Sequence, residues 1–98
     1  MLKLQGRIKK VFETQSFENF KKRVFWLEDV NEKYPNTWEF ELWNKDVDMI
    51  DSYQEGDFVT VYFDVKGKVY SKNGKDFCMN TLKCWNFEKE GKLFKEIN

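Results

Sequence analysis

Lysines and aromatic residues are interleaved between positions 66 and 77. Of all the side chains in this sequence, they are the best suited to bind a ligand. An ammonium group contacts phosphate as a point charge, and an aromatic ring offers a nucleobase a surface on which to stack. Together they favour binding of a single-stranded nucleic acid without strong sequence preference. The candidate residues in this segment are Lys66, Lys68, Tyr70, Lys72, Lys75 and Phe77.

A second basic run, formed by Lys21, Lys22 and Arg23, lies far from the first in sequence. The formal net charge is zero, yet the first 27 residues carry seven basic and two acidic side chains, and the last 34 carry eight and four. The middle of the chain is strongly acidic, with two basic side chains against eleven acidic ones. A zero total argues against indiscriminate binding to polyanions. If the two basic parts fold onto one face, that face can still follow a phosphate backbone.

Catalysis is not expected from this sequence. It has no His, which removes the commonest general base, and it has no glycine-rich phosphate loop or nucleophile motif. Cys78 and Cys84 are too few for a zinc site, and we expect both to be reduced. Asp46, Asp48 and Asp51 are better explained by a helix N-terminus, where acidic side chains favour the dipole, than by a cation site. The sequence therefore predicts a binding protein without a metal or another cofactor.

The length of 98 residues suits one domain. No apolar run reaches the ~18 residues that a membrane span needs. The early polar residues of the N-terminal segment argue against a signal peptide. We therefore expect a cytoplasmic protein with a folded domain at residues 1–88 and a charged C-terminal extension at residues 89–98.

Alternating apolar and polar residues predict five strands and so an all-β fold. The apolar phase of the first strand slips after Ile8, close to Gly6, which indicates a bulge or a bend. The polar segment 14–19 is expected to be a loop. The five strands are expected at residues 2–13, 20–30, 37–43, 57–65 with a continuation to 70, and 77–87.

A short helix is expected between the third and fourth strands, because Val47, Ile50 and Tyr53 recur at every third residue. The dipeptide Asn73-Gly74 predicts a tight turn between the fourth and fifth strands. Three strands, a short helix and two further strands give the order of a five-stranded OB-fold barrel. OB-folds bind oligonucleotides on the face of the second and third strands, beside the first loop and the loop before the fifth strand. Both basic runs lie at these two loops.

Two tryptophans can reach that binding face. Glu39 and Glu41 cannot be buried unpaired, so their face of the third strand points outward, and Trp43 shares it. In the second strand, either Trp26 points outward and Phe25 faces the core, or the reverse holds. We favour an outward Trp26, because Trp is harder to bury fully than Phe.

Three features between Thr37 and Phe77 recur together in a known pattern. A third strand that carries Trp ends in an aromatic residue and a turn with a lysine. The sequence Glu55-Gly56-Asp57 then opens the fourth strand, and a basic, aromatic hairpin follows. This pattern resembles bacterial and phage single-stranded DNA-binding proteins of the OB class. The chain looks similar, too, to an uncharacterised family of short OB-like domains, through its Gly-Arg-Ile-Lys-Lys-Val start and its Leu-Lys-x-Trp fifth strand.

The resemblance implies non-enzymatic binding of single-stranded DNA in replication, recombination or repair. It implies that Trp43 and Tyr70 stack on bases, and small OB domains of this kind commonly enlarge their footprint as homodimers. RNA would suit the same combination of rings and lysines. The family usually ends in a flexible acidic tail that recruits partners, whereas this chain ends in Phe-Lys-Glu-Ile-Asn.

The glutamates on the face of Trp43 leave a second interpretation open. Glu39 and Glu41 would repel phosphates unless lysines of the second strand pair with them. Otherwise the acidic middle of the chain meets a protein. The alternative function is thus an OB module without enzymatic activity that docks a replication or repair partner.

Overall fold

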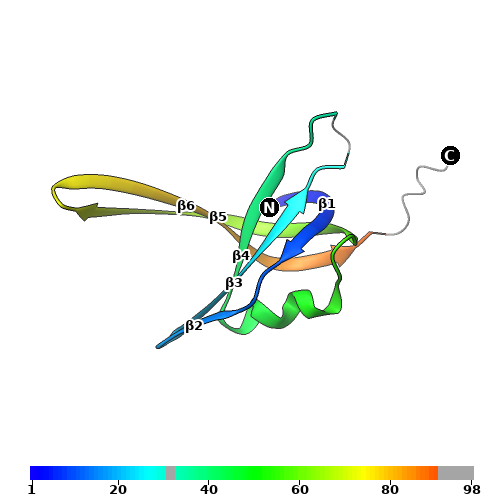
Figure 1. Cartoon of the computed structure of the whole chain (residues 1–98), viewed down its shortest axis with the longest axis horizontal. Coiled ribbons are helices and arrows are strands. Elements are labelled where there is room, and N and C mark those ends of the chain that lie inside the picture. Colours follow the sequence, from blue (N-terminus) through cyan, green and yellow to red (C-terminus); the bar gives the residue numbers. More distant parts are fainter. Residues whose placement is uncertain (31–32, 91–98) are drawn as a thin grey trace.

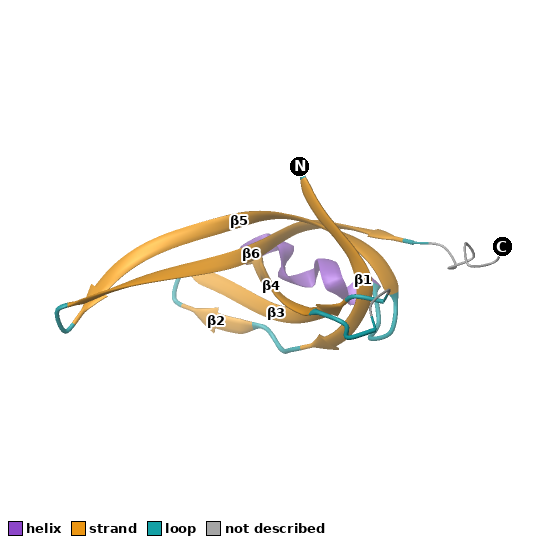
Figure 2. Ribbon diagram, turned by 90° about the horizontal axis from the view of Figure 1, so that it is seen from above, coloured by secondary structure: helices purple, strands orange, loops and turns teal. Residues whose placement is uncertain are grey.

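The computed structural model describes residues 1–30 and 33–90. Six strands form one sheet in the order β1-β5-β6-β4-β3-β2, and an additional pairing of β1 with β3 closes five of them into a barrel (Figures 1 and 2). The elements are β1 (Leu2–Val11), β2 (Gln15–Phe17), β3 (Phe20–Glu28), β4 (Thr37–Trp43), the 3₁₀ helix η1 (Asn44–Ser52), β5 (Phe58–Lys72) and β6 (Lys75–Lys89). No helix in the described ranges is long and apolar enough to cross a membrane.

β1 serves two sides of the barrel, because its first half pairs with β5 and its second half pairs with β3. The change of partner coincides with a register shift between Ile8 and Lys10, so the predicted bulge is confirmed. Gly6 lies where β1 passes close to both of its partner strands, β5 and β3. A Cβ atom there would lie 2.4 Å from the carbonyl oxygen of Glu28, so only glycine fits without a shift of the backbone.

The prediction of a loop at residues 14–19 was wrong for its middle part. Gln15–Phe17 forms β2, which pairs with the start of β3 through a turn at Glu18 and Asn19. The rings of Phe17 and Phe20 stack with their centroids 6.1 Å apart across this small hairpin. Cross-strand aromatic pairs stabilise such hairpins, and the polar composition of the segment concealed this one.

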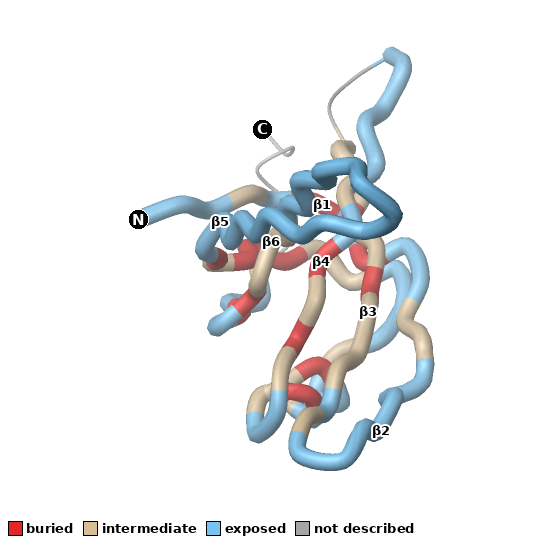
Figure 3. Tube along the Cα trace, turned by 90° about the vertical axis from the view of Figure 1, so that its left-hand side faces the viewer, coloured by how far each residue is buried: buried red, intermediate tan, exposed pale blue. Residues whose placement is uncertain are grey.

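The core lies between the inward faces of the five barrel strands β1, β3, β4, β5 and β6, and η1. Phe25 and Leu27 of β3 are completely buried, and so are Phe40 and Leu42 of β4. Buried positions alternate with partly exposed ones along both strands (Figure 3). Trp26 is therefore on the outward face, as predicted.

η1 plugs one end of the barrel with Val47 and Ile50, which are both buried. A 3₁₀ helix has three residues per turn, so side chains three apart lie on the same side. The spacing of three in the sequence thus predicted the helix correctly for Val47 and Ile50, whereas Tyr53 is extended and follows the last residue of η1. The first residue of η1, Asn44, has a positive φ of 51° and accepts a hydrogen bond from the backbone N–H of Lys21 at 3.0 Å.

β5 and β6 extend well beyond the barrel as a two-stranded ribbon, which we call the arm (residues 66–81; Figure 1). Its tip is the predicted tight turn, with φ of 54° at Asn73 and 77° at Gly74. Positive φ at both positions matches the twist of the two strands. The predicted extension at residues 89–98 begins at the last residue of β6, and residues 91–98 lie outside the described part of the chain.

Candidate nucleic-acid interface

The outward side of β3 and β4 presents a surface that we call the outer face. Residues directly opposite each other in antiparallel strands share one side of the sheet. Three such pairs build the outer face, namely Trp26 with Glu39, Val24 with Glu41, and Lys22 with Trp43. The two tryptophans thus lie on the same side, about 13 Å apart along the strand direction at a rise of ~3.3 Å per residue.

β6 extends the outer face toward the arm. It runs parallel to β4, with Lys83 beside Glu41. The ammonium nitrogen of Lys83 lies 5.5 Å from the ring centroid of Trp43, which is a cation–π contact. Phe20 packs edge-on against Trp43, with the centroids 5.5 Å apart. The Trp43 ring is therefore in contact with both an aromatic residue and a cation.

A hollow of about 490 Å³, which we call the groove, lies between the outer face and the arm. Lys22 and Trp43 line it from β3 and β4, and Lys66 and Lys68 line it from β5. The groove thus brings together basic residues that are more than forty positions apart in sequence. One lysine of the first basic run and two of the second border the same space.

The arm continues this lysine-lined surface away from the barrel. Tyr70 pairs with Phe77, and Lys72 pairs with Lys75. Because side chains alternate along a strand and paired residues share a side, all six candidate residues lie on one face of the arm, the face on which Lys66 and Lys68 line the groove. The rings of Tyr70 and Phe77 stack at 5.3 Å with an interplanar angle of 22°, and they are 40% and 41% exposed.

Trp26 stands in a separate hollow of about 410 Å³ at the far end of the outer face. Lys9, Thr37 and Glu39 line this hollow with it. Phe12 packs edge-on against the Trp26 ring, with the centroids 5.1 Å apart. The outer face thus has a tryptophan with an aromatic neighbour at each end.

Arg23 lies on the opposite side of β3, among the inward-facing positions. Its guanidinium donates hydrogen bonds to the carbonyl oxygens of Phe12 at 2.9 Å and Val47 at 3.1 Å. It also pairs with the Asp51 carboxylate at 2.9 Å, and its side chain is 17% exposed. Arg23 therefore ties β1, β3 and η1 together and does not reach the groove.

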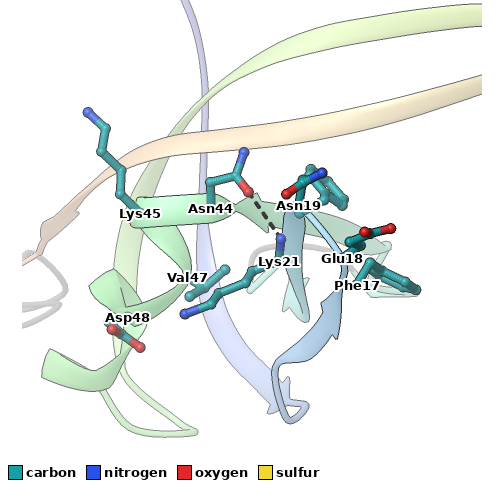
Figure 4. Close-up of a pocket in the computed structure, with 9 residues that line it drawn as sticks. Phe17, Glu18, Asn19, Lys21, Asn44, Lys45, Val47 and Asp48 are labelled. Atoms are coloured by element: carbon teal, nitrogen blue, oxygen red, sulfur yellow. Dashed lines mark hydrogen bonds between the residues drawn. The ribbon is translucent and has the colours of Figure 1, made fainter.

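Lys21 likewise lies away from the groove. Its side chain lines a hollow of about 340 Å³ between the β2–β3 turn and the start of η1 (Figure 4). Lys45 lies at the same hollow, together with the acidic side chains of Glu18 and Asp48. The structure thus separates Lys21 and Arg23 from Lys22, because neighbouring residues of a strand point to opposite sides.

The two glutamates of the outer face are paired with the tryptophans. The indole N–H of Trp26 donates to Glu39 at 3.0 Å, and that of Trp43 donates to Glu41 at 2.8 Å. Lys22 lies 3.9 Å from the second oxygen of Glu41. The pairing with a lysine of the second strand, which the sequence left open, is present for Glu41.

Three contributors to this surface were missing from the sequence-based set. Phe12 and Phe20 buttress the two tryptophans, and Lys83 lies over Trp43. Phe20 adjoins the basic run Lys21-Lys22-Arg23, so its position was a usable signal. Lys83 comes to Trp43 only through the parallel contact of β4 with β6, which no local pattern reveals.

The cysteines take no part in this surface chemistry. Cys84 is completely buried in the core, and this burial raises the pKa of its thiol to about 12. Cys78 is exposed on the arm, on the side away from the groove. Within residues 1–30 and 33–90, no three acidic or cysteine side chains gather in a way that could hold a metal ion.

Solved structures of similar shape share this architecture. The mitochondrial single-stranded DNA-binding protein Rim1 of S. cerevisiae matches with a TM-score of 0.69 and 16% identity over 90% of this chain and 91% of that chain. The Plasmodium falciparum SSB in complex with ssDNA matches with a TM-score of 0.54 and 20% identity over 84% and 82%. The small single-stranded DNA-binding protein of Streptomyces coelicolor matches with a TM-score of 0.52 and 12% identity over 92% and 93%.

The fold is thus an OB-fold of the kind found in single-stranded DNA-binding proteins, as the sequence resemblance implied. Residues 3–88 match the family described as "Domain of unknown function (DUF3127)", and the chain belongs to that family. No curated protein matches the sequence.

Proposed function

We propose that this chain binds single-stranded DNA in the groove and along the arm, without catalysing a reaction. The observation that carries the proposal is that the six lysine and aromatic candidates share the face of the arm on which Lys66 and Lys68 line the groove with Lys22 and Trp43. The fold supports it, because OB-folds bind oligonucleotides on this face. The proteins of similar structure are single-stranded DNA-binding proteins, one of them in complex with ssDNA.

In this proposal the rings hold the bases. Trp43 stacks on one base in the groove, and the exposed Tyr70–Phe77 pair offers a second stacking surface on the arm. Stacking of a base on an aromatic side chain is worth ~1–3 kcal/mol and tolerates any base, since every base has a π-face. Stacking on these rings therefore gives affinity without recognising a base sequence.

The lysines hold the backbone. Six ammonium groups border the path from the barrel to the tip of the arm, and they belong to Lys22, Lys66, Lys68, Lys72, Lys75 and Lys83. Contacts to phosphates release bound counterions, so the affinity falls as salt rises. Such a protein serves wherever single strands are exposed, as in replication, recombination and repair.

A fluorescence titration tests the proposal. The intrinsic Trp signal is followed while dT oligomers of increasing length are added at low and at physiological salt. We expect saturable quenching that weakens with salt, and a loss of about fivefold or more in affinity for Trp43→Ala, which corresponds to the lower end of the stacking range.

Two neighbouring lysines provide a matched control. Lys22→Ala removes a charge from the groove, and Lys21→Ala removes the same charge from the opposite side of β3. The proposal requires that only the first weakens binding substantially. Absence of binding at low salt would reject the proposal and favour the module that docks a protein partner.

A further inference from the structure

The two tryptophan hollows of the outer face repeat one combination of chemical groups. The hollow around Trp26 is lined by Glu39 and by Lys9, whose ammonium group is paired with Glu28 at 3.0 Å. The groove around Trp43 is lined by Glu41 and Lys22, which are paired with each other at 3.9 Å. Each space thus offers a stacking ring, an acceptor and a cation.

The carboxylates are fixed in place by the rings beside them. Each glutamate receives the indole N–H of its tryptophan on one oxygen, at 3.0 Å for Glu39 and 2.8 Å for Glu41. An ionised carboxylate is an acceptor only, and its two oxygens have about four lone-pair sites. Each group therefore keeps acceptor capacity at the edge of the ring on which a base would stack.

The four bases differ in what they offer to such an acceptor. Cytosine and adenine carry exocyclic amino donors, and guanine carries the N2 amino group, whereas thymine presents carbonyl acceptors at O2 and O4. The one N–H donor of thymine and uracil lies between these two carbonyls, which a carboxylate repels. Glutamate accepting from the amino group of cytosine is an established pairing of this type.

We propose that Glu39 and Glu41 favour bases that carry an amino group over thymine and uracil, which makes both glutamates specificity-determining residues. The inference rests on the proposed function and extends it, since the strand would continue from Trp43 along the outer face and stack a further base on Trp26. The same negative charges repel phosphates from the centre of the outer face. The bases therefore face this surface, and the sugar-phosphate backbone lies along the lysines. The result is a bias in base composition and not the recognition of a sequence.

The test compares a dC oligomer with a dT oligomer of equal length, at pH 8 and one fixed salt concentration. Affinities for both are measured by fluorescence anisotropy for the wild type, Glu39→Gln, Glu41→Gln and the double variant. A glutamine oxygen still accepts the indole N–H, so the rings stay in place, while the amide N–H₂ supplies a donor for thymine. The ratio of the dC affinity to the dT affinity is the measured quantity, because the free oligomers contribute equally for every variant.

We expect the double variant to lower this ratio by about fivefold or more, corresponding to the lower end of the discrimination for a good base contact. Both affinities should rise together because negative charge is removed, so the ratio separates base selection from charge. Glu88→Gln is the matched control, since Glu88 lies on β6 and accepts from the Tyr62 hydroxyl at 2.7 Å. Its ratio should equal that of the wild type.

The outcomes separate this inference from the proposed function. An unchanged ratio in the double variant, with both oligomers still bound, would overturn the inference and leave single-strand binding intact. A fall of the ratio in Glu88→Gln as large as in the double variant would also overturn it. Absence of binding to either oligomer at low salt would reject the proposed function itself.

Discussion

Replacement of Arg23 by alanine should destabilise the barrel and leave DNA binding by the folded protein intact. The guanidinium donates to two backbone carbonyls, of Phe12 and Val47, and only 17% of the side chain is exposed. Hydrogen bonds that involve a charged group contribute ~1.5–3 kcal/mol each, and removal of the donor leaves both carbonyls without it. The ion pair with Asp51 adds little, because that carboxylate is 60% exposed and is screened by water.

These contributions predict a loss of roughly 2–4 kcal/mol in the free energy of unfolding for Arg23→Ala, allowing for local relaxation. For a domain of this size the corresponding fall in Tm is roughly 10–30 °C. Arg23→Lys keeps the charge but loses the planar fork that reaches two carbonyls at once, so it should be intermediate.

Urea unfolding followed by circular dichroism measures the stability, and anisotropy with a labelled oligomer at a temperature where each variant is folded measures the binding. Lys22→Ala is the counterpart on the other side of β3, and it should lose affinity while its Tm changes little. The reasoning is refuted if folded Arg23→Ala binds DNA as weakly as Lys22→Ala, or if its unfolding free energy equals that of the wild type.

Three further predictions concern the arm, β1 and the cysteines. Removal of both Lys66 and Lys68 should reduce the slope of log K against log salt for a single strand by about 0.7 per lysine, as measured by titration over a salt series, and an unchanged slope would contradict their contact with phosphates. Gly6→Ala should destabilise the protein by more than 1 kcal/mol in urea unfolding, because the new Cβ would lie 2.4 Å from a carbonyl oxygen of β3; a wild-type midpoint would contradict this close approach. At pH 8 a thiol reagent should modify Cys78 only, since burial raises the pKa of Cys84 to about 12, and both should react in urea; rapid modification of Cys84 in the folded protein would show that the core opens there.

The alternation of side chains was enough to predict the strands and the direction of most residues. It gave β4 with its correct bounds and placed Trp43 outward, whereas the outward Trp26 was chosen between two open orientations because Trp is harder to bury than Phe. The same rule was available for Arg23, which is two residues from the buried Phe25, but its positive charge suggested a surface role. A guanidinium can nevertheless face inward when backbone carbonyls accept its hydrogen bonds, and only the fold shows where those carbonyls are.

Contacts between distant strands could not be predicted. The parallel pairing of β4 with β6 places Lys83 against Trp43, and the curvature of the sheet brings Lys66 toward Lys22. Both depend on how the barrel closes, which is a property of the whole chain. The indole hydrogen bonds of the glutamates belong to the same class, because the sequence shows two acids near two tryptophans but not that the pairs are held together.

The arm also has a consequence for the order in which its hydrogen bonds open. A two-stranded ribbon with no third strand beside it is marginally stable in water. The strands of the arm pair only with each other from Lys66 to Lys72, while nearer the barrel β5 is also paired with β1 and β6 with β4. The free energy of local opening should therefore decrease from the barrel toward Asn73, because the barrel end of the ribbon is anchored in the core and the tip is not. A DNA strand that binds first at Trp43 would then stabilise the ribbon progressively toward its tip. The ordered length of the arm would therefore depend on how much of the arm is covered by DNA.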